Sequence, residues 1–217
     1  MSISTQENAL LDEWHESRRK ESGGNEVAFV RDGMVDEDGY TKSNPKIAYV
    51  LKEYAPAGRG NDLRSDLHDG VGYWWGKVDY MTHSIRRLRD TPGLPTDPDS
   101  KRLREMRLSI CAFNLSKIGG NTSTDMQLLA LQAMKRREFI QRQFALYDPG
   151  LTICCGTFNV FRYALAHDEM KVNEGKHINW YERSPGKFVI DTYHFAYPAF
   201  GYTMIDNVVN EIKGFFK

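Results

Sequence analysis

Residues 46–58 read Lys-Ile-Ala-Tyr-Val-Leu-Lys-Glu-Tyr-Ala-Pro-Ala-Gly, and their character changes abruptly halfway along. The run from Ile47 to Leu51 is unbroken by polar residues and includes β-branched and aromatic side chains. Such a run is typical of a strand that helices cover on both faces of a parallel sheet. Glu53 follows at the carboxyl end of this strand, where open α/β sheets place their ligands. The stretch therefore predicts a fold class and the position of a site.

The plan of strand, loop and helix recurs along the rest of the chain. Further strands are expected at residues 107–115, 151–155 and 187–191. Apolar residues at helical spacing predict helices over residues 74–88, 124–146, 158–165 and 204–216. Because crossovers between parallel strands are nearly always right-handed, this order implies helices on both faces of the sheet. We predict an α/β fold: one three-layer αβα domain with a central four-stranded, mainly parallel sheet.

The part of the chain before the central strand reads as an extension of this domain. Residues 5–20 predict a helix, and residues 26–31 predict a short strand before two Asp-Gly turn signals. We therefore interpret residues 1–217 as a single domain in which residues 1–45 form an N-terminal helical and hairpin extension.

Composition and charge limit the classes of function. Lys and Arg total 29 and Asp and Glu total 29, so no overall positive charge indicates a polyanionic partner, and any nucleic-acid contact must come from a local patch. The three cysteines, Cys111, Cys154 and Cys155, have neither disulfide-framework nor metal-ligand spacing and are expected to be buried, reduced thiols. No apolar signal region or membrane-spanning segment is evident, so we expect a soluble, cytoplasmic protein with no membrane partner.

The four loops at residues 53–58, 114–115, 156–159 and 193–198 resemble, in order and placement, those of the uracil-DNA glycosylase superfamily. Residues 53–58 (Glu-Tyr-Ala-Pro-Ala-Gly) are similar to a lengthened form of that family's Gly-Glu-Ala-Pro-Gly loop. Asn114-Leu115 resembles its base-reading Asn-Leu, and residues 156–159 (Gly-Thr-Phe-Asn) resemble its Gly-x-x-aliphatic turn. Residues 193–198 (Tyr-His-Phe-Ala-Tyr-Pro) stand where the family carries His-Pro-Ser. The resemblance implies a DNA glycosylase that flips a base out of the helix and hydrolyses its N-glycosidic bond.

The sequence departs from the family pattern in three ways. No glycine directly precedes Glu53, Phe195-Ala196 replace Pro-Ser, and four cysteines placed for an iron–sulfur cluster are lacking. We therefore expect no cofactor and no metal. The altered loops leave room for a base larger than uracil, such as a glycosylated or hydroxymethylated cytosine of phage DNA, which would make the protein a defence enzyme.

Two residues are candidates for the chemistry itself. Cleavage between deoxyribose and a base passes through an oxocarbenium-like state, which needs an anion near the sugar and a hydrogen-bond donor for the departing base. Glu53 could supply the anion and His194 the donor. The alternatives are that Glu53 is a solvated loop carboxylate or pairs with Lys52, and that His194 only packs in an aromatic corner.

Other residues are candidates for binding the base and the DNA backbone. Asn114 offers a donor and an acceptor to a pyrimidine edge, and Tyr54 and Phe113 could stack on an extruded base. The alternatives are a turn-initiating Asn114 and aromatic residues that belong to the core. The glycine-rich loop before the helix at residue 124 suits a phosphate. The predicted backbone contacts are Ser116, Gly119, Gly120, Asn121, Thr122, Gly156, Thr157 and Ala196.

We therefore expect a DNA glycosylase whose partner is DNA, acting as a monomer without an obligate protein partner. The alternative is a non-catalytic nucleic-acid or protein-binding module that keeps the fold. Abasic-site formation measured beside DNA binding distinguishes the two.

Overall fold

The structure is a computed structural model, and it describes residues 1–54, 62–70, 74–88, 98–120 and 123–216. These residues form an α/β fold around a mixed sheet of seven strands, in the order β1-β3-β2-β4-β7-β6-β5. The strands are β1 (Gly33–Met34), β2 (Ile47–Tyr54), β3 (Cys111–Gly119), β4 (Leu151–Cys155), β5 (Asn173–Glu174), β6 (Asn179–Ser184) and β7 (Lys187–Thr192).

The four predicted strands are present as the parallel centre of this sheet, but the prediction of a four-stranded sheet is wrong. β3, β2, β4 and β7 pair in parallel, whereas β1, β6 and β5 extend the edges in antiparallel pairs. β6 has the polar sequence Asn-Trp-Tyr-Glu-Arg-Ser with only Tyr181 buried, so no apolar run identified it. β3 also begins later than predicted, because residues 107 and 108 end a helix that Asp99 caps.

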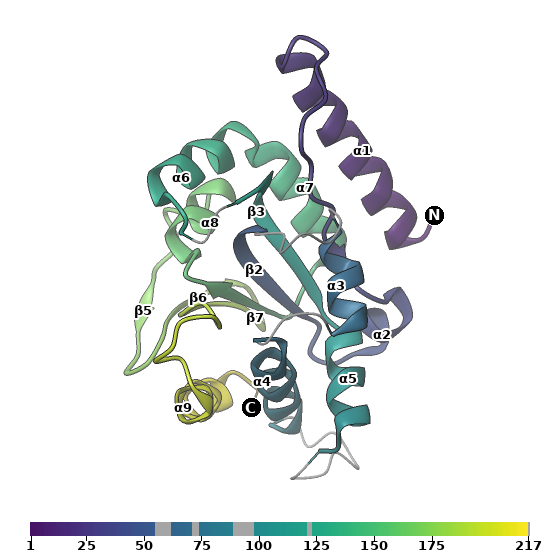
Figure 1. Cartoon of the computed structure of the whole chain (residues 1–217). Helices are drawn as coiled ribbons and strands as arrows, with labels where there is room; N and C mark the ends of the chain where they lie inside the picture. Colours follow the sequence, from purple (N-terminus) through teal and green to yellow (C-terminus); the bar gives the residue numbers. More distant parts are fainter. Residues whose placement is uncertain (55–61, 71–73, 89–97, 121–122, 217) are drawn as a thin grey trace.

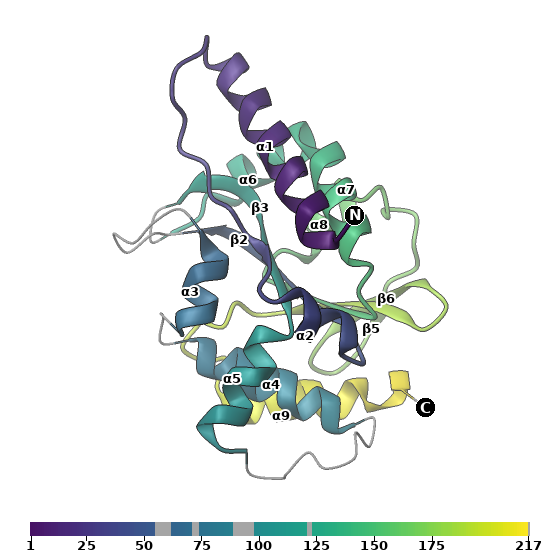
Figure 2. The same ribbon diagram turned by 90° about the vertical axis from the view of Figure 1, so that its right-hand side faces the viewer.

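Helices cover both faces of the sheet (Figures 1 and 2). One layer contains α1 (Ile3–Glu21), α6 (Met126–Lys135), α7 (Arg137–Tyr147) and α8 (Phe158–Ala164). The other contains α3 (Leu63–Asp69), α4 (Trp75–Arg87), α5 (Ser100–Leu108) and α9 (Tyr202–Ile212). α2 (Glu37–Lys42) packs near α5, and a short 3₁₀ turn, η1 (Lys213–Phe216), follows α9. The three-layer arrangement follows from the central strand, which is buried on both faces.

Alternation along β2 divides the interior into two cores. Ile47, Tyr49 and Leu51 belong to the core shared with α3, α4 and α9. Ala48 and Val50 belong to the core shared with α1, α7 and α8. Successive side chains of a strand point to opposite faces, so the unbroken apolar run is explained by helices on both sides.

The N-terminal segment is tied to the sheet by buried charged groups. Lys117 on β3 and Asp32 just before β1 are fully buried and form an ion pair, with Nζ 2.6 Å from Oδ1. Glu7 of α1 accepts a hydrogen bond from the backbone N–H of Met34 at 3.0 Å. Residues 26–31, predicted as a strand, form none, and β1 pairs with β3 instead of completing a hairpin.

The helix predicted over residues 124–146 is two helices that meet at Arg136. The guanidinium of Arg136 lies 2.5 Å from Glu21 at the end of α1, and this contact holds the junction against the N-terminal helix. All three cysteines are buried and free, as predicted. None of the helices in the described part of the chain combines the length and apolar character needed to span a bilayer.

Candidate functional site

The parallel register brings the carboxyl ends of β2, β3, β4 and β7 to one edge of the sheet (Figure 1). Four short stretches meet there: residues 52–54, 119–120, 156–157 and 192–196. Open α/β sheets bind ligands at this edge. Residues 55–58, 121 and 122, which also belong to the predicted site, lie outside the described residues.

Glu53 is half-buried and closely covered by the backbone of Gly120. The N–H of Gly120 donates to the carbonyl of Tyr54 at 2.7 Å, and a Cβ on Gly120 would lie 2.3 Å from Cδ of Glu53. Only glycine permits this approach. Neither Glu53 nor Lys52 forms an ion pair within the described segments. The alternative in which Glu53 pairs with Lys52 is therefore wrong.

His194 is held in one tautomer by its own loop. Its Nδ1 accepts a hydrogen bond from the backbone N–H of Ala196 at 3.2 Å, so in the neutral ring the proton is on Nε2. Burial first, and then the nearby charge of Lys52, lower the pKa of His194 from 6.5 to about 4. The imidazole is therefore neutral at physiological pH and presents an N–H donor.

The loop that carries His194 is fixed by α4. The ring of Trp74 lies 5.3 Å from the His194 ring and stacks on Phe195 at 6.2 Å. Lys77 donates from Nζ to the carbonyl of Phe195 at 2.9 Å. The aromatic corner considered as an alternative for His194 is thus real, and it leaves Nε2 without a hydrogen-bond partner among the described residues.

Lys52, near the end of β2, lies close to the ends of β4 and β7. A Cβ on Gly156, whose φ is +67°, would lie 3.2 Å from Cε of Lys52 and 4.0 Å from the backbone nitrogen of His194. Lys52 therefore lies against the turn after β4 and beside the histidine loop. Its ammonium supplies local positive potential at this edge of a chain whose net charge is zero.

Tyr54 is half-buried, and its hydroxyl donates to Asp66 on α3. The ring also packs against the core beneath α3 and α4. This contact fixes the ring next to Glu53, in a place where one face could meet a ligand.

Asn114 and Phe113 do not lie at the strand end. Asn114 is buried, and its backbone N–H and side-chain amide donate to Asp32 at 2.7 and 3.0 Å. Phe113 is fully buried against Phe144 and Phe161. β3 continues to Gly119 because the polar groups of residues 114–117 are satisfied inside the protein, so the predicted strand end at Asn114 is wrong.

Most of the predicted backbone-binding groups already have internal partners. The hydroxyl of Ser116 donates to Gln132 at 2.7 Å, and that of Thr157 donates to the carbonyl of Val50 at 2.9 Å. The N–H of Gly156 donates to the carbonyl of Thr192 at 2.7 Å, and the N–H of Ala196 donates to Nδ1 of His194. Gly119 is exposed at the end of β3.

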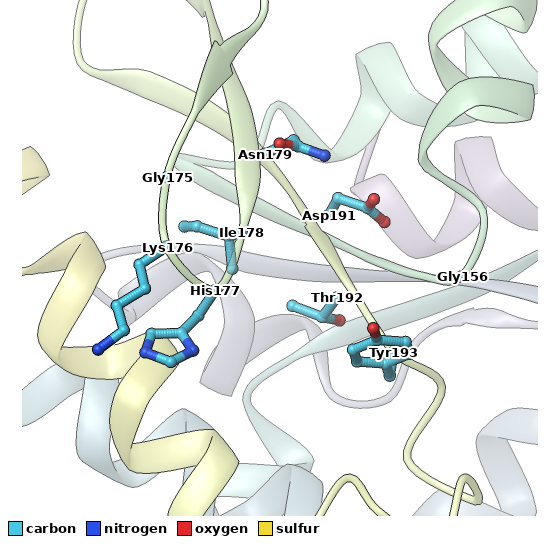
Figure 3. A pocket seen from close by; sticks show the side chains of 9 residues that line it. All are labelled: Gly156, Gly175, Lys176, His177, Ile178, Asn179, Asp191, Thr192 and Tyr193. Atoms are coloured by element: carbon cyan, nitrogen blue, oxygen red, sulfur yellow. The ribbon is translucent and has the colours of Figure 1, made fainter.

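A pocket of about 350 Å³ opens beside this edge, at the end of β7 (Figure 3). Its lining includes Gly156, Asn179, Asp191, Thr192 and Tyr193. Burial raises the pKa of the Asp191 carboxyl to about 6. The sequence carried a usable signal for this residue, because Asp191 is a carboxylate that directly follows the buried run of residues 188–190.

No group of three or more His, Cys, Asp or Glu side chains in the described segments is placed to hold a metal ion. Compared with known proteins, the chain matches no family model and no curated protein.

Proposed function

We propose that the protein is a DNA glycosylase that hydrolyses the N-glycosidic bond of a flipped pyrimidine. The observation that carries the proposal is the tautomer of His194, whose Nδ1 accepts from Ala196 and whose neutral ring therefore donates from Nε2. A neutral donor suits a leaving base that gains negative charge as its bond to the sugar breaks. The resemblance of the four loops supports the same reaction.

Glu53 has the complementary task in this proposal. As the C1′–N bond breaks, electrons leave with the base and positive charge develops on the sugar. The carboxylate of Glu53 stabilises this charge and orients the water that adds to C1′. The water's proton is released as the abasic sugar forms, and the departing base takes up a proton. The half-buried position of Glu53 under Gly120 strengthens its electrostatic effect compared with that of a fully solvated carboxylate.

Lys52 assists the departing base. Burial, and then the ammonium of Lys52, lower the pKa of His194, and this ammonium, packed between the turn after β4 and the histidine loop, also adds positive potential where the base becomes anionic. Tyr54, fixed by Asp66, supplies an aromatic ring for the extruded base. Asn114 and Phe113 have no part in this site, because both are engaged in the core.

The substrate class in this proposal is DNA that contains an uracil-like or modified pyrimidine. Glycosylases act on a base only after it leaves the stack, so the edge must admit both the base and its backbone. A base larger than uracil, such as a modified cytosine of phage DNA, fits the departures of the loops from the family pattern. A role in defence would follow from that substrate.

The experiment is a single-turnover assay of abasic-site formation, by alkaline cleavage, on matched duplexes that differ in one pyrimidine. Wild-type protein should release at least one modified base, and Glu53→Gln and His194→Ala should each slow release by about 10²-fold without lowering the melting temperature. The exposed Glu174→Gln is the matched control and should leave the rate unchanged. DNA binding without release of any base would show instead a binding module on this fold.

A further inference from the structure

The pocket at the end of β7 is next to the candidate site but takes no part in the chemistry proposed above. We propose that it is a specificity subsite that holds a neutral, hydroxyl-bearing substituent of the target base, with the carboxylate of Asp191 as its hydrogen-bond acceptor. This inference rests on the proposed glycosylase function.

Asp191 is a half-buried carboxylate. Its side chain forms no hydrogen bond or ion pair with any of the described residues. Burial is the sole cause of its raised pKa, which agrees with the absence of a neighbouring cation in the described segments. A buried carboxylate is costly unless donors satisfy it, so a ligand with hydroxyl groups would remove this cost.

The groups around Asp191 both donate and accept hydrogen bonds. Trp180 pairs with Ile190, so Asn179 is the cross-strand neighbour of Asp191, and Figure 3 shows their side chains beside each other with Tyr193 below. The amide of Asn179 and the hydroxyl of Tyr193 can each donate and accept, whereas the hydroxyl of Thr192 donates to the carbonyl of Cys154 at 3.3 Å and can only accept. Such a mixture matches hydroxyl groups, which also donate and accept.

The charges of the lining favour a neutral occupant. Asp191 disfavours an anion, whereas Lys176 on the opposite wall disfavours a cation. Figure 3 shows the Lys176 side chain directed away from Asp191, so the two do not neutralise each other by direct contact. Among the lining residues, Asp191 carries a negative charge and Lys176 a positive charge.

The wall of the pocket is held in place before any ligand binds. The loop between β5 and β6 closes with a hydrogen bond from Gly175 N–H to Ile178 carbonyl at 2.9 Å. The N–H of His177 donates to Glu211 on α9, also at 2.9 Å. A Cβ on Gly175 would lie 1.6 Å from Oε1 of the same glutamate, so glycine allows this close approach. A preformed wall is typical of small-molecule sites.

The pocket is continuous with the reacting edge through Gly156. This glycine lines the pocket and also lies against Lys52 and the backbone of His194. A base placed at His194 can therefore extend a substituent past Gly156 towards Asp191. The volume of about 350 Å³ lies within the range of small-ligand pockets.

The test measures equilibrium binding of duplexes whose single target nucleotide carries a 2′-fluoro group, which slows bond cleavage. The target bases are cytosines with 5-methyl, 5-hydroxymethyl, 5-aminomethyl or 5-carboxyl groups. We expect wild-type protein to bind the hydroxymethyl duplex about tenfold or more tighter than the methyl duplex. Asp191→Ala should abolish this preference and leave the methyl duplex unaffected, and the exposed Asp168→Asn should retain the preference.

The outcomes separate this inference from the proposed function. A preference that survives in Asp191→Ala, or tighter binding of the aminomethyl or carboxyl duplex than of the hydroxymethyl one, would overturn the subsite. Base release without any substituent preference would refute the subsite and keep the glycosylase. A preference lost in Asp191→Ala, with no base released from any cleavable duplex, would keep the subsite and refute the reaction. Asp191→Asn preserves the side-chain shape and should show an intermediate preference, which excludes loss of folding as the cause.

Discussion

The backbone N–H of Ala196 donates to Nδ1 of His194 across a single residue, at 3.2 Å. This bond selects the neutral tautomer with its proton on Nε2, and Trp74 and Lys77 fix the loop around it. Ala196, which stands at the third position of the His-Pro-Ser pattern, therefore orients the histidine through its backbone. The identity of its side chain is of no consequence for that hydrogen bond.

The first prediction concerns the protonation of this histidine. Because burial and Lys52 lower its pKa to about 4, His194 should remain in the Nε2–H form from pH 8 down to about pH 5. ¹⁵N chemical shifts of the imidazole, assigned with His194→Ala, measure both the tautomer and the titration. A midpoint near the ordinary value of about 6.5 would contradict the assignment.

The same shift has a defined effect on stability. The unfolded chain binds a proton at His194 near pH 6.5, whereas the folded chain does so only near pH 4, so this histidine contributes a loss of stability as the pH falls between them. His194→Ala should reduce that part of the pH dependence. Urea unfolding at several pH values between 4 and 7 measures it.

Gly120→Ala is predicted to damage the site without changing the charge of any group. The added Cβ would lie 2.3 Å from Cδ of Glu53, so either the carboxylate or the end of β3 must move. We expect single-turnover base release to fall by at least about tenfold, since small displacements of a catalytic group are costly. Gly201→Ala is the control, because its Cβ would meet no atom within 4 Å. Equal rates of base release for Gly120→Ala and Gly201→Ala would show that the close approach of Gly120 does not matter for the function of Glu53.

Asn114→Ala is predicted to lower the stability of the fold and to have no direct effect on the reaction. The side-chain amide of Asn114 donates to Asp32 at 3.0 Å inside the protein, and its removal leaves that buried carboxylate with one donor fewer. We expect the free energy of unfolding to fall by about 1–3 kcal/mol. Chemical denaturation measures this, with the exposed Asn159→Ala as control. If Asn114→Ala were as stable as the wild type but no longer discriminated between target bases, Asn114 would have to contact the base.

Asp191→Asn should stabilise the ligand-free protein at neutral pH. The folded-state pKa of about 6 exceeds the usual 3.8, so the folded chain holds the proton more tightly and stability is lost as the pH rises through 6. The uncharged amide of Asp191→Asn does not lose stability in this way, so the variant's free energy of unfolding at neutral pH should be higher by about 1 kcal/mol after allowance for solvent screening. Melting temperatures should therefore differ at pH 7.5 and converge near pH 4. Identical curves for the wild type and the variant would indicate that Asp191 is solvated.

The parallel centre of the fold was predictable because each of its strands has apolar residues for both faces. Residues 151–155 form a strand as expected, and the run from residue 47 forms the central one. The edges were not predictable from apolar runs, because β1 has two residues and β6 is mostly polar. α3 carried a signal that periodicity missed: Asp62 caps its start, and Gly70 ends it in the left-handed conformation.

The sheet edge at which Glu53 and His194 lie was predictable, but which other polar side chains reach that edge was less so. Glu53 lies near the carboxyl end of β2, and His194 follows β7. Asn114 also follows an apolar run, yet its strand continues because Lys117 is neutralised by Asp32, which is distant in sequence. Only a tertiary contact decides whether a polar residue ends a strand or is buried within it.

The position of β4 between β2 and β7 also has a consequence for how the protein acquires its site. Glu53 lies near the end of β2, early in the chain, whereas His194 follows β7, and β4 lies between these two strands in the sheet. Contacts between such distant segments form slowly in folding. A nascent chain that has emerged only as far as α8 contains Glu53 but lacks His194, so the two side chains of the candidate site cannot come together until β7 and the loop after it have been synthesised.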